Sequence, residues 1–113
     1  MPTFKYDDLA VVYPSPTTAR RLAHSDHLMM VIVDFADGPT PPAPPHQHPH
    51  EQVTYIAQGP INFIMGAGDS AQVSRLMTGD MVVVPPDVPH TVEVLAGTAR
   101  LIDCFYPLRE DFI

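Results

Sequence analysis

Alternating apolar and polar residues divide the second half of the chain into short segments. Residues 51–57 place Gln52, Thr54 and Ile56 on one parity and the intervening residues on the other. Further β-prone segments follow, separated by turns rich in glycine, proline and aspartate, at 61–65, 70–77, 81–84, 90–95 and 99–106. Because alternate residues of a strand face opposite sides of a sheet, this period predicts β-strands. No convincing amphipathic helix interrupts them, so we expect an all-β sandwich or small barrel.

The first half of the chain is less regular. Residues 28–36 are apolar on both parities and rich in β-branched side chains, which predicts a strand covered on both faces and ended by residues 37–38. Residues 9–13 predict a short edge strand ended by Pro14, whereas residues 17–26 show no clear period. One face of the 28–36 strand lines the core, and its other apolar face needs a second cover. We therefore expect a homodimer.

Length and domain size predict one domain over the whole chain. At 113 residues the protein is large enough for a core but short for two functional units. We expect residues 1–113 to form a single domain, with an arm and edge strand over 1–27, a barrel over 28–106 and a tail over 107–113.

Charge, cysteine content and hydropathy limit the partners, the disulfides and the location that we expect for the protein. The formal net charge is −7 and Lys5 is the single lysine, so no basic stripe follows a phosphate backbone and we expect no nucleic-acid partner. Cys104 is the only cysteine, which excludes an intrachain disulfide. No apolar run is long enough to span a bilayer and no N-terminal stretch has the pattern of a signal peptide. We expect a cytoplasmic protein without a membrane partner.

Three of the six histidines lie within five residues, directly after a proline-rich segment. Residues 39–45 contain five prolines, which exclude helix and central strand and predict a stiff extended arm that delivers His46 at a defined position. His46 and His48 are two apart, so on an extended chain they face the same side, and Gln52 shares their parity. Neutral imidazole is the commonest protein ligand for transition metals, and His90 is the expected distant ligand.

The remaining histidines fit a metal site less well. His50 shares the parity of the cluster, but Pro49 can break the strand before it. Glu51 lies on the opposite face and reaches the metal only if the register slips by one residue. His24 and His27 lie outside any ligand spacing and are expected at the surface.

The two histidine regions resemble the paired motifs of the cupin superfamily. The first motif, with glutamine in place of the usual glutamate, matches Gly38, His46, His48, Gln52 and Gly59. The second matches Gly79, Pro85 and His90, although Asp87 and Val94 stand where glycine and asparagine are common. The resemblance implies an RmlC-like double-stranded β-helix, a jelly-roll barrel. It also implies one divalent transition metal ion (Ni, Zn, Fe, Mn or Co) held by His46, His48, Gln52 and His90.

A narrower resemblance comes from the histidine cluster taken together with the C-terminal end. The sequence His-x-His-Pro-His-Glu-Gln at 46–52 is followed near the end by Asp103, Phe105, Pro107, Arg109, Glu110 and Asp111. This combination is similar to small pectin-degradation cupins of the KdgF type, which convert cyclic 4,5-unsaturated uronates to linear keto sugars. It implies a small sugar acid as the substrate.

The same resemblance gives roles to three residues near the C-terminus. Asp103 is expected to act as general acid or base, Arg109 to pair with the substrate carboxylate, and Phe105 to form a wall of the pocket. Each has a structural alternative. Asp103 would hydrogen-bond a ligand histidine, Phe105 would belong to the core, and Arg109 would form a surface ion pair with Glu110 or Asp111.

Gln52 bears on the type of chemistry. Three imidazoles and a carboxamide leave a divalent ion with its full charge, whereas a glutamate ligand would reduce that charge by one. This favours Lewis-acid isomerase chemistry over oxygen activation. A metal-dependent cupin dioxygenase is the alternative, and a non-catalytic small-molecule-binding cupin is a second one.

Overall fold

Antiparallel strands form most of the regular secondary structure in a computed structural model that describes all residues, 1–113. The strands are β1 (Val12–Ser15), β2 (Thr18–His24), β3 (Met29–Thr40), β4 (Glu51–Gln58), β5 (Ile61–Met65), β6 (Gln72–Leu76), β7 (Met81–Val84) and β8 (His90–Tyr106). Three short 3-10 helices complete the chain, η1 (Tyr6–Asp8), η2 (Gly68–Ser70) and η3 (Glu110–Phe112). No helix has the length and apolar character needed to cross a membrane. The all-β prediction is confirmed.

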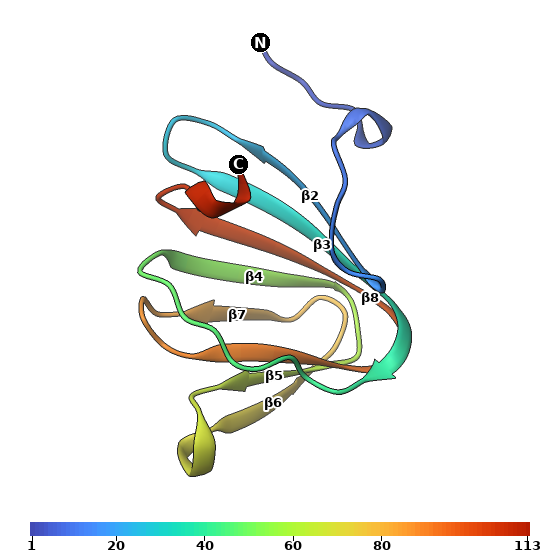
Figure 1. The fold of residues 1–113 in the computed structure, drawn as a ribbon, viewed down its shortest axis with the longest axis vertical. Helices are drawn as coiled ribbons and strands as arrows, with labels where there is room; N and C mark the ends of the chain where they lie inside the picture. The colour runs from blue at the N-terminus through green and yellow to red at the C-terminus, as the bar shows by residue number, and fades with distance from the viewer.

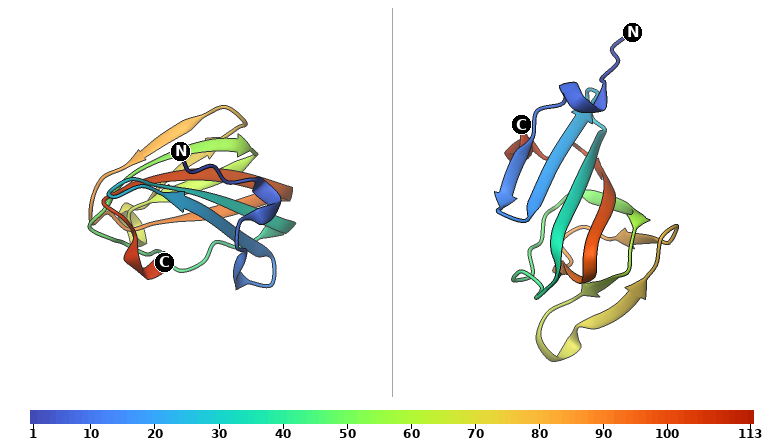
Figure 2. Two further views of the ribbon diagram at one scale, coloured as in Figure 1. Left: turned by 90° about the horizontal axis from the view of Figure 1, so that it is seen from above. Right: turned by 90° about the vertical axis from the view of Figure 1, so that its right-hand side faces the viewer.

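One long strand, β8, belongs to both halves of the fold. Its first half pairs with β5, and its second half lies between β3 and β4. The main sheet runs β1-β2-β3-β8-β4-β7, and β6 pairs with β5. Figure 1 shows β8 passing from the side of β5 to the side of β3, and Figure 2 shows the sheet curling so that the two halves face each other.

The predicted turn between segments 90–95 and 99–106 is wrong, because β8 bends there and continues. Gly97 adopts a φ of 56° at the bend and lies opposite Gly38 of β3. A Cβ atom on Gly38 would stand 2.8 Å from Cγ1 of Val94, so glycine is required for this close approach. The predicted end of the first long strand at residues 37–38 is also wrong. That strand bends with β8 and continues to Thr40, with register irregularities around Gly38.

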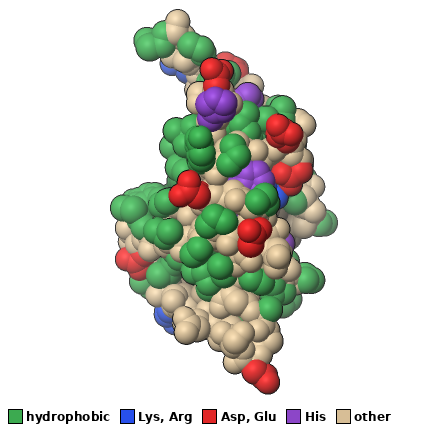
Figure 3. Space-filling model, turned by 90° about the vertical axis from the view of Figure 1, so that its left-hand side faces the viewer, with side chains coloured by type: hydrophobic (Ala, Val, Ile, Leu, Met, Phe, Trp, Pro, Cys, Tyr) green, Lys and Arg blue, Asp and Glu red, His purple; other side chains and the backbone are tan.

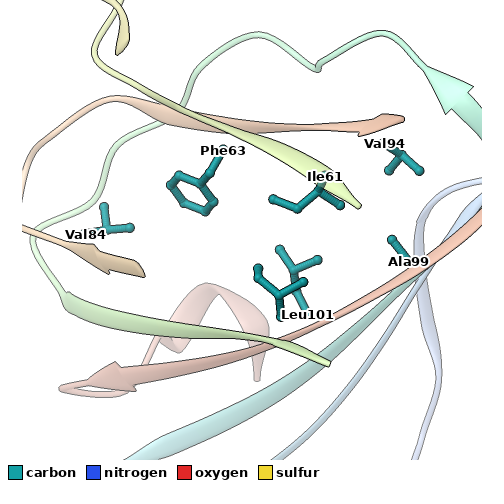
Figure 4. Close-up of a cluster of buried hydrophobic side chains, with 7 residues drawn as sticks. Ile61, Phe63, Val84, Val94, Ala99 and Leu101 are labelled. Carbon is teal, nitrogen blue, oxygen red and sulfur yellow. The ribbon is translucent and has the colours of Figure 1, made fainter. Parts of the chain in front are cut away.

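The main core fills the space between the two halves of the curled sheet. Burial alternates along β4, with Gln52, Thr54 and Ile56 buried and their neighbours exposed, as the two-residue period predicted. Burying an aliphatic or aromatic side chain stabilises the fold by about 1.5–3 kcal/mol. Figure 4 shows the β5 side chains directed toward those of β8. The cluster comprises Ile56, Ile61, Phe63, Val84, Val94, Ala99 and Leu101.

A second, smaller core anchors the C-terminal tail. Met29, Val31 and Phe105 are buried together, and Leu108 and Phe112 of the tail pack against them. The tail therefore folds back over the barrel instead of extending into solvent. In Figure 1 the C-terminal turn lies beside the ends of β3 and β8.

Strand β2 occupies residues for which the sequence showed no clear period. It pairs with β3 along its whole length, from Thr18 opposite Phe35 to His24 opposite Met29. Thr18 and Arg20 line a pocket, so polar residues occupy positions on the inward face. This mixture removes the apolar alternation by which a strand is normally recognised.

Candidate metal centre and active site

Three histidines converge at one end of the barrel interior. The backbone amides of His46 and His90 each donate to the other's carbonyl oxygen, at 3.1 and 2.9 Å. The hydroxyl of Thr91 donates to the carbonyl of Ala43 at 2.8 Å, which fixes the proline-rich arm beside β8. One potential ligand atom from each of His46, His48 and His90 lies within 4.8 Å of the other two. Together these three imidazoles can hold a metal ion.

The ring of His90 is oriented so that one of its nitrogens is free to bind a ligand. Nδ1 of His90 lies 2.9 Å from the carbonyl oxygen of Val88. Because a carbonyl only accepts, Nδ1 carries the proton and Nε2 presents its lone pair. Nε2 of His90 is buried without a hydrogen-bond partner. A buried nitrogen is normally paired, so this one fits a cation.

The electrostatics of the cluster keep its imidazoles neutral. Burial, with the neighbouring His90 as a further contribution, lowers the pKa of His46 to about 4, although His46 is the most exposed of the three. Burial also lowers the pKa values of His48 and His90. Neutral imidazole is the form that binds a metal, so the cluster is in its ligating state at neutral pH.

A chain of hydrogen bonds runs from the histidine cluster to Asp103. Nε2 of His48 lies 3.0 Å from Oε1 of Gln52. The amide nitrogen of Gln52 donates to Oγ1 of Thr54 at 2.9 Å. The Thr54 hydroxyl in turn donates to Oδ1 of Asp103 at 2.6 Å. Asp103 therefore contacts the cluster through two intermediate side chains, and not by a direct bond to a histidine.

The carboxyl group of Asp103 is protonated more readily in the pocket than it would be in water. Burial raises the pKa of this carboxyl to about 6, while the hydrogen bond from Thr54 and the charge of Arg109 act in the opposite direction. A carboxyl group with a pKa near neutrality can both accept and donate a proton during turnover.

Phe105 and Arg109 line the same pocket as the histidines. Phe105 is 2% exposed and meets the His48 ring edge-on, with ring centroids 5.5 Å apart. Arg109 donates from Nε and Nη2 to the two carboxylate oxygens of Asp111, at 3.2 and 2.7 Å. The predicted ion pair is thus present, but the Arg109 side chain is only 11% exposed and its charge faces the pocket as well.

The pocket has a volume of about 360 Å³ and opens beside the histidine cluster. The space-filling view shows histidine side chains at the surface in the upper half of this face, among hydrophobic and acidic groups (Figure 3). The pocket brings together groups from four regions of the chain, including Arg20, His46, Gln52, His90, Asp103, Phe105 and Arg109.

The other histidines and Glu51 are directed elsewhere. Nε2 of His50 lies 3.0 Å from the carbonyl oxygen of Leu108, so this ring holds the C-terminal tail. His24 and His27 are exposed, as predicted, and Glu51 is exposed on the outer side of β4.

Two residues in or beside the pocket were not singled out by the sequence pattern. Thr54 was recognised as sharing the face of Gln52, but its bond to Asp103 links residues 49 positions apart. Arg20 lies in the segment that showed no period. Asp87 adopts a φ of 63°, which explains why glycine is common at that position of the motif.

Comparison with known proteins gives consistent matches. A family model described as a cupin domain matches residues 31–105. The chain is 37% identical over 90 residues to the pectin degradation protein KdgF of Dickeya dadantii (strain 3937), which covers 79% of this chain and 76% of that protein.

Two solved structures superpose on nearly the whole chain. KdgF from Halomonas sp. has a TM-score of 0.84 and 31% identity, with 99% of this chain and all of that chain covered. An RmlC-like cupin from Shewanella frigidimarina NCIMB 400 also has a TM-score of 0.84, at 27% identity, with 97% and 94% covered. The expected RmlC-like architecture is confirmed by these matches.

Proposed function

This chain belongs to the cupin family, and from that membership we propose that it is a metal-dependent enzyme that opens and isomerises the ring of an unsaturated uronate or similar sugar acid. The observation that carries the proposal is the pair of hydrogen bonds that connects Gln52, beside the histidine cluster, through Thr54 to Asp103. Gln52 and Asp103 line one pocket with His46, His90 and Arg109. The relative named as a pectin degradation protein, KdgF of Dickeya dadantii, supports the substrate class.

The metal ligands in this proposal are His46, His48, His90 and Gln52. Nε2 of His48 and Oε1 of Gln52 lie 3.0 Å apart, so both side chains are directed to the same point. A divalent Ni, Zn, Fe, Mn or Co ion held by this neutral set supplies Lewis-acid polarisation of a substrate oxygen.

Asp103 is the proposed acid and base. Thr54 occupies Oδ1, so Oδ2 remains for the substrate. The carboxylate removes the proton of the anomeric hydroxyl as the ring C–O bond breaks, which leaves an aldehyde and an enolate. The protonated Asp103 then delivers this proton to the alkene carbon, which completes a linear keto sugar and restores the carboxylate. No atom or electron is gained or lost overall, so the reaction needs no oxidant.

Phe105 and Arg109 position the substrate in this mechanism. Phe105 presents its ring to the pocket and holds the His48 edge in place. Arg109 stacks on Phe112, with Cζ 4.0 Å from the ring centroid, and keeps one edge of its guanidinium free of Asp111. That free edge can pair with the uronate carboxylate.

The proposed reaction is tested with 4,5-unsaturated galacturonate. Metal-loaded wild-type protein should convert it to the linear keto form, as followed by NMR, without consuming oxygen. Asp103→Asn should reduce the rate by at least about 100-fold, which is the usual contribution of a positioned acid or base. The variant should retain its metal, as measured by elemental analysis. A wild-type rate equal to the uncatalysed rate would exclude the proposal, and oxygen uptake with the substrate would favour the dioxygenase alternative.

The proposal includes a homodimer formed through the outer face of the main sheet. Two register rows cross β3, β8, β4 and β7 on that face. They consist of Met30, Cys104, Val53 and Val83, and of Ile32, Ile102, Tyr55 and Met81. Exposures of 53% for Met30, 64% for Val83 and 67% for Met81 leave apolar surface uncovered. Neither row carries a charge, so two copies of a chain with net charge −7 can meet there without juxtaposing acidic groups.

A further inference from the structure

Arg20 projects from β2 into the pocket that contains the histidine cluster. It pairs in register with Val33 of β3, which in turn pairs with the buried Leu101 of β8. Arg20 therefore lies on the inward face of the sheet and lines the pocket together with Asp103 and Arg109. The next residue, Arg21, points to the opposite face, where Asp34 lies 3.6 Å from its guanidinium.

Arg20 differs from the other pocket arginine in having no polar partner. It forms no side-chain hydrogen bond or ion pair, and its Nε is buried without a partner. Its Cζ lies 3.8 Å from the centroid of the Phe112 ring. Arg109 also stacks on the Phe112 ring, with its Cζ 4.0 Å from the ring centroid. Two of its nitrogens, however, already donate to Asp111.

A guanidinium that is partly desolvated and has no polar partner is energetically unfavourable unless an anion pairs with it. Burial and the charge of Arg109 both lower the pKa of Arg20, and the more distant Asp111 offsets only part of this effect. The two arginines closest to it in the sequence or the pocket are paired, Arg21 with Asp34 and Arg109 with Asp111. Unpaired charges at the wall of a pocket are a common feature of sites for oppositely charged ligands.

We propose that Arg20 binds the carboxylate of the substrate, through the Nε–Nη edge that no protein group occupies. The inference rests on the proposed sugar-acid function and deepens it by adding a second carboxylate-recognition residue from a different strand. Planar, bidentate pairing with a carboxylate is the interaction for which an arginine fork is suited. Arg20 and Arg109 thus flank Phe112 and select acids over neutral sugars of the same shape.

The selectivity can be measured by binding, independently of turnover. Calorimetry of metal-loaded protein should show tighter binding of galacturonate than of its neutral methyl ester. Arg20→Met should weaken galacturonate binding by about 10- to 100-fold, the value of charge-assisted hydrogen bonds, and leave ester binding unchanged. Arg20→Lys, which keeps the charge but loses the fork, should give an intermediate loss. Arg21→Met on the same strand is the matched control and should behave as wild type.

The outcomes separate this inference from the proposed function. If Arg20→Met, folded by circular dichroism, still discriminates acid from ester as the wild type does, the carboxylate is bound elsewhere and the inference is wrong even if the enzyme turns over unsaturated uronates. If the wild type does not discriminate, the inference is also wrong. If discrimination depends on Arg20 but unsaturated galacturonate is not converted, the anion site stands and the proposed reaction fails.

Discussion

Asp103 and Thr54 determine how proton chemistry is coupled to the histidine cluster. The Thr54 hydroxyl is buried and has one acceptor in Asp103 and one donor in Gln52. Its bond to Asp103 stabilises the carboxylate and opposes the effect of burial on the pKa. Thr54 therefore adjusts the pH at which Asp103 changes its protonation state.

Replacing Thr54 with valine should move the pH profile in a defined direction. In the wild type, protonation of Asp103 near pH 6 should reduce kcat/KM at lower pH, because the base form is required. Thr54→Val removes a bond that lowers this pKa, so the acidic limb should shift to higher pH. A bound cation lowers the pKa of Asp103 in both proteins. The test therefore compares the pH of the acidic limb in Thr54→Val with that in the wild type.

The measurement is kcat/KM from pH 5 to 8 for wild type, Thr54→Val and a control. Thr98→Val is a matched control, since the Thr98 hydroxyl accepts an exposed bond from Gln58 far from the pocket. An unchanged or lowered limb in Thr54→Val would show that this hydrogen bond does not tune the catalytic group.

The sequence alone predicted which residues share the ligand face, but it did not predict every contact within the pocket. His46, His48 and His90 were expected together, and the structure brings them together, because a His-x-His pattern and an extended arm are local features. The roles of Thr54 and Arg20 depend on which strands become neighbours in the curled sheet. Such neighbours are set by topology and leave no short-range pattern.

At the scale of strands, prediction succeeded where one face packs against a core. Strand β4 shows strict alternation and was predicted within two residues of its observed end. Strand β2 was missed because polar residues on its inward face line the pocket. The continuity of β8 was missed because a bend at Gly97 resembles a turn in sequence, and only pairing with β3 distinguishes the two.

The uncovered face of the main sheet gives a prediction at this scale. Val83→Glu places a charge at the β7 end of the apolar rows, so two copies would bring carboxylates into a desolvated contact. Light scattering coupled to size-exclusion chromatography should give a dimer for wild type and a monomer for this variant.

Val73→Glu is the control for the dimer prediction. Val73 is also an exposed strand valine, at 60% exposure, but it lies on β6 away from the two rows. This variant should remain a dimer. A monomeric wild type, or loss of the dimer in Val73→Glu alone, would contradict the proposed interface.

At the scale of the whole molecule, the curled sheet combines groups that are distant in the chain. The proline-rich arm places His46 against His90, the C-terminal end of β8 contributes Asp103, and the C-terminal tail closes over Phe105 with Arg109. A small barrel with one open end thus contains a neutral ligand set, a carboxyl group of raised pKa and cationic side chains. This combination suits Lewis-acid chemistry on an anionic sugar.

If the histidine cluster holds a metal on which uronate ring opening depends, the initial rate of 4,5-unsaturated galacturonate conversion should follow the metal content of the protein. The rate is measured with one preparation before chelation, after removal of metal and chelator, and after reloading. We expect a loss of at least about 100-fold on removal, recovery on reloading, and no recovery in His90→Ala, whose metal content should also fall. A metal-free protein that retains the full rate, or a His90→Ala variant with full metal and full rate, would show that ring opening does not depend on a metal at this cluster.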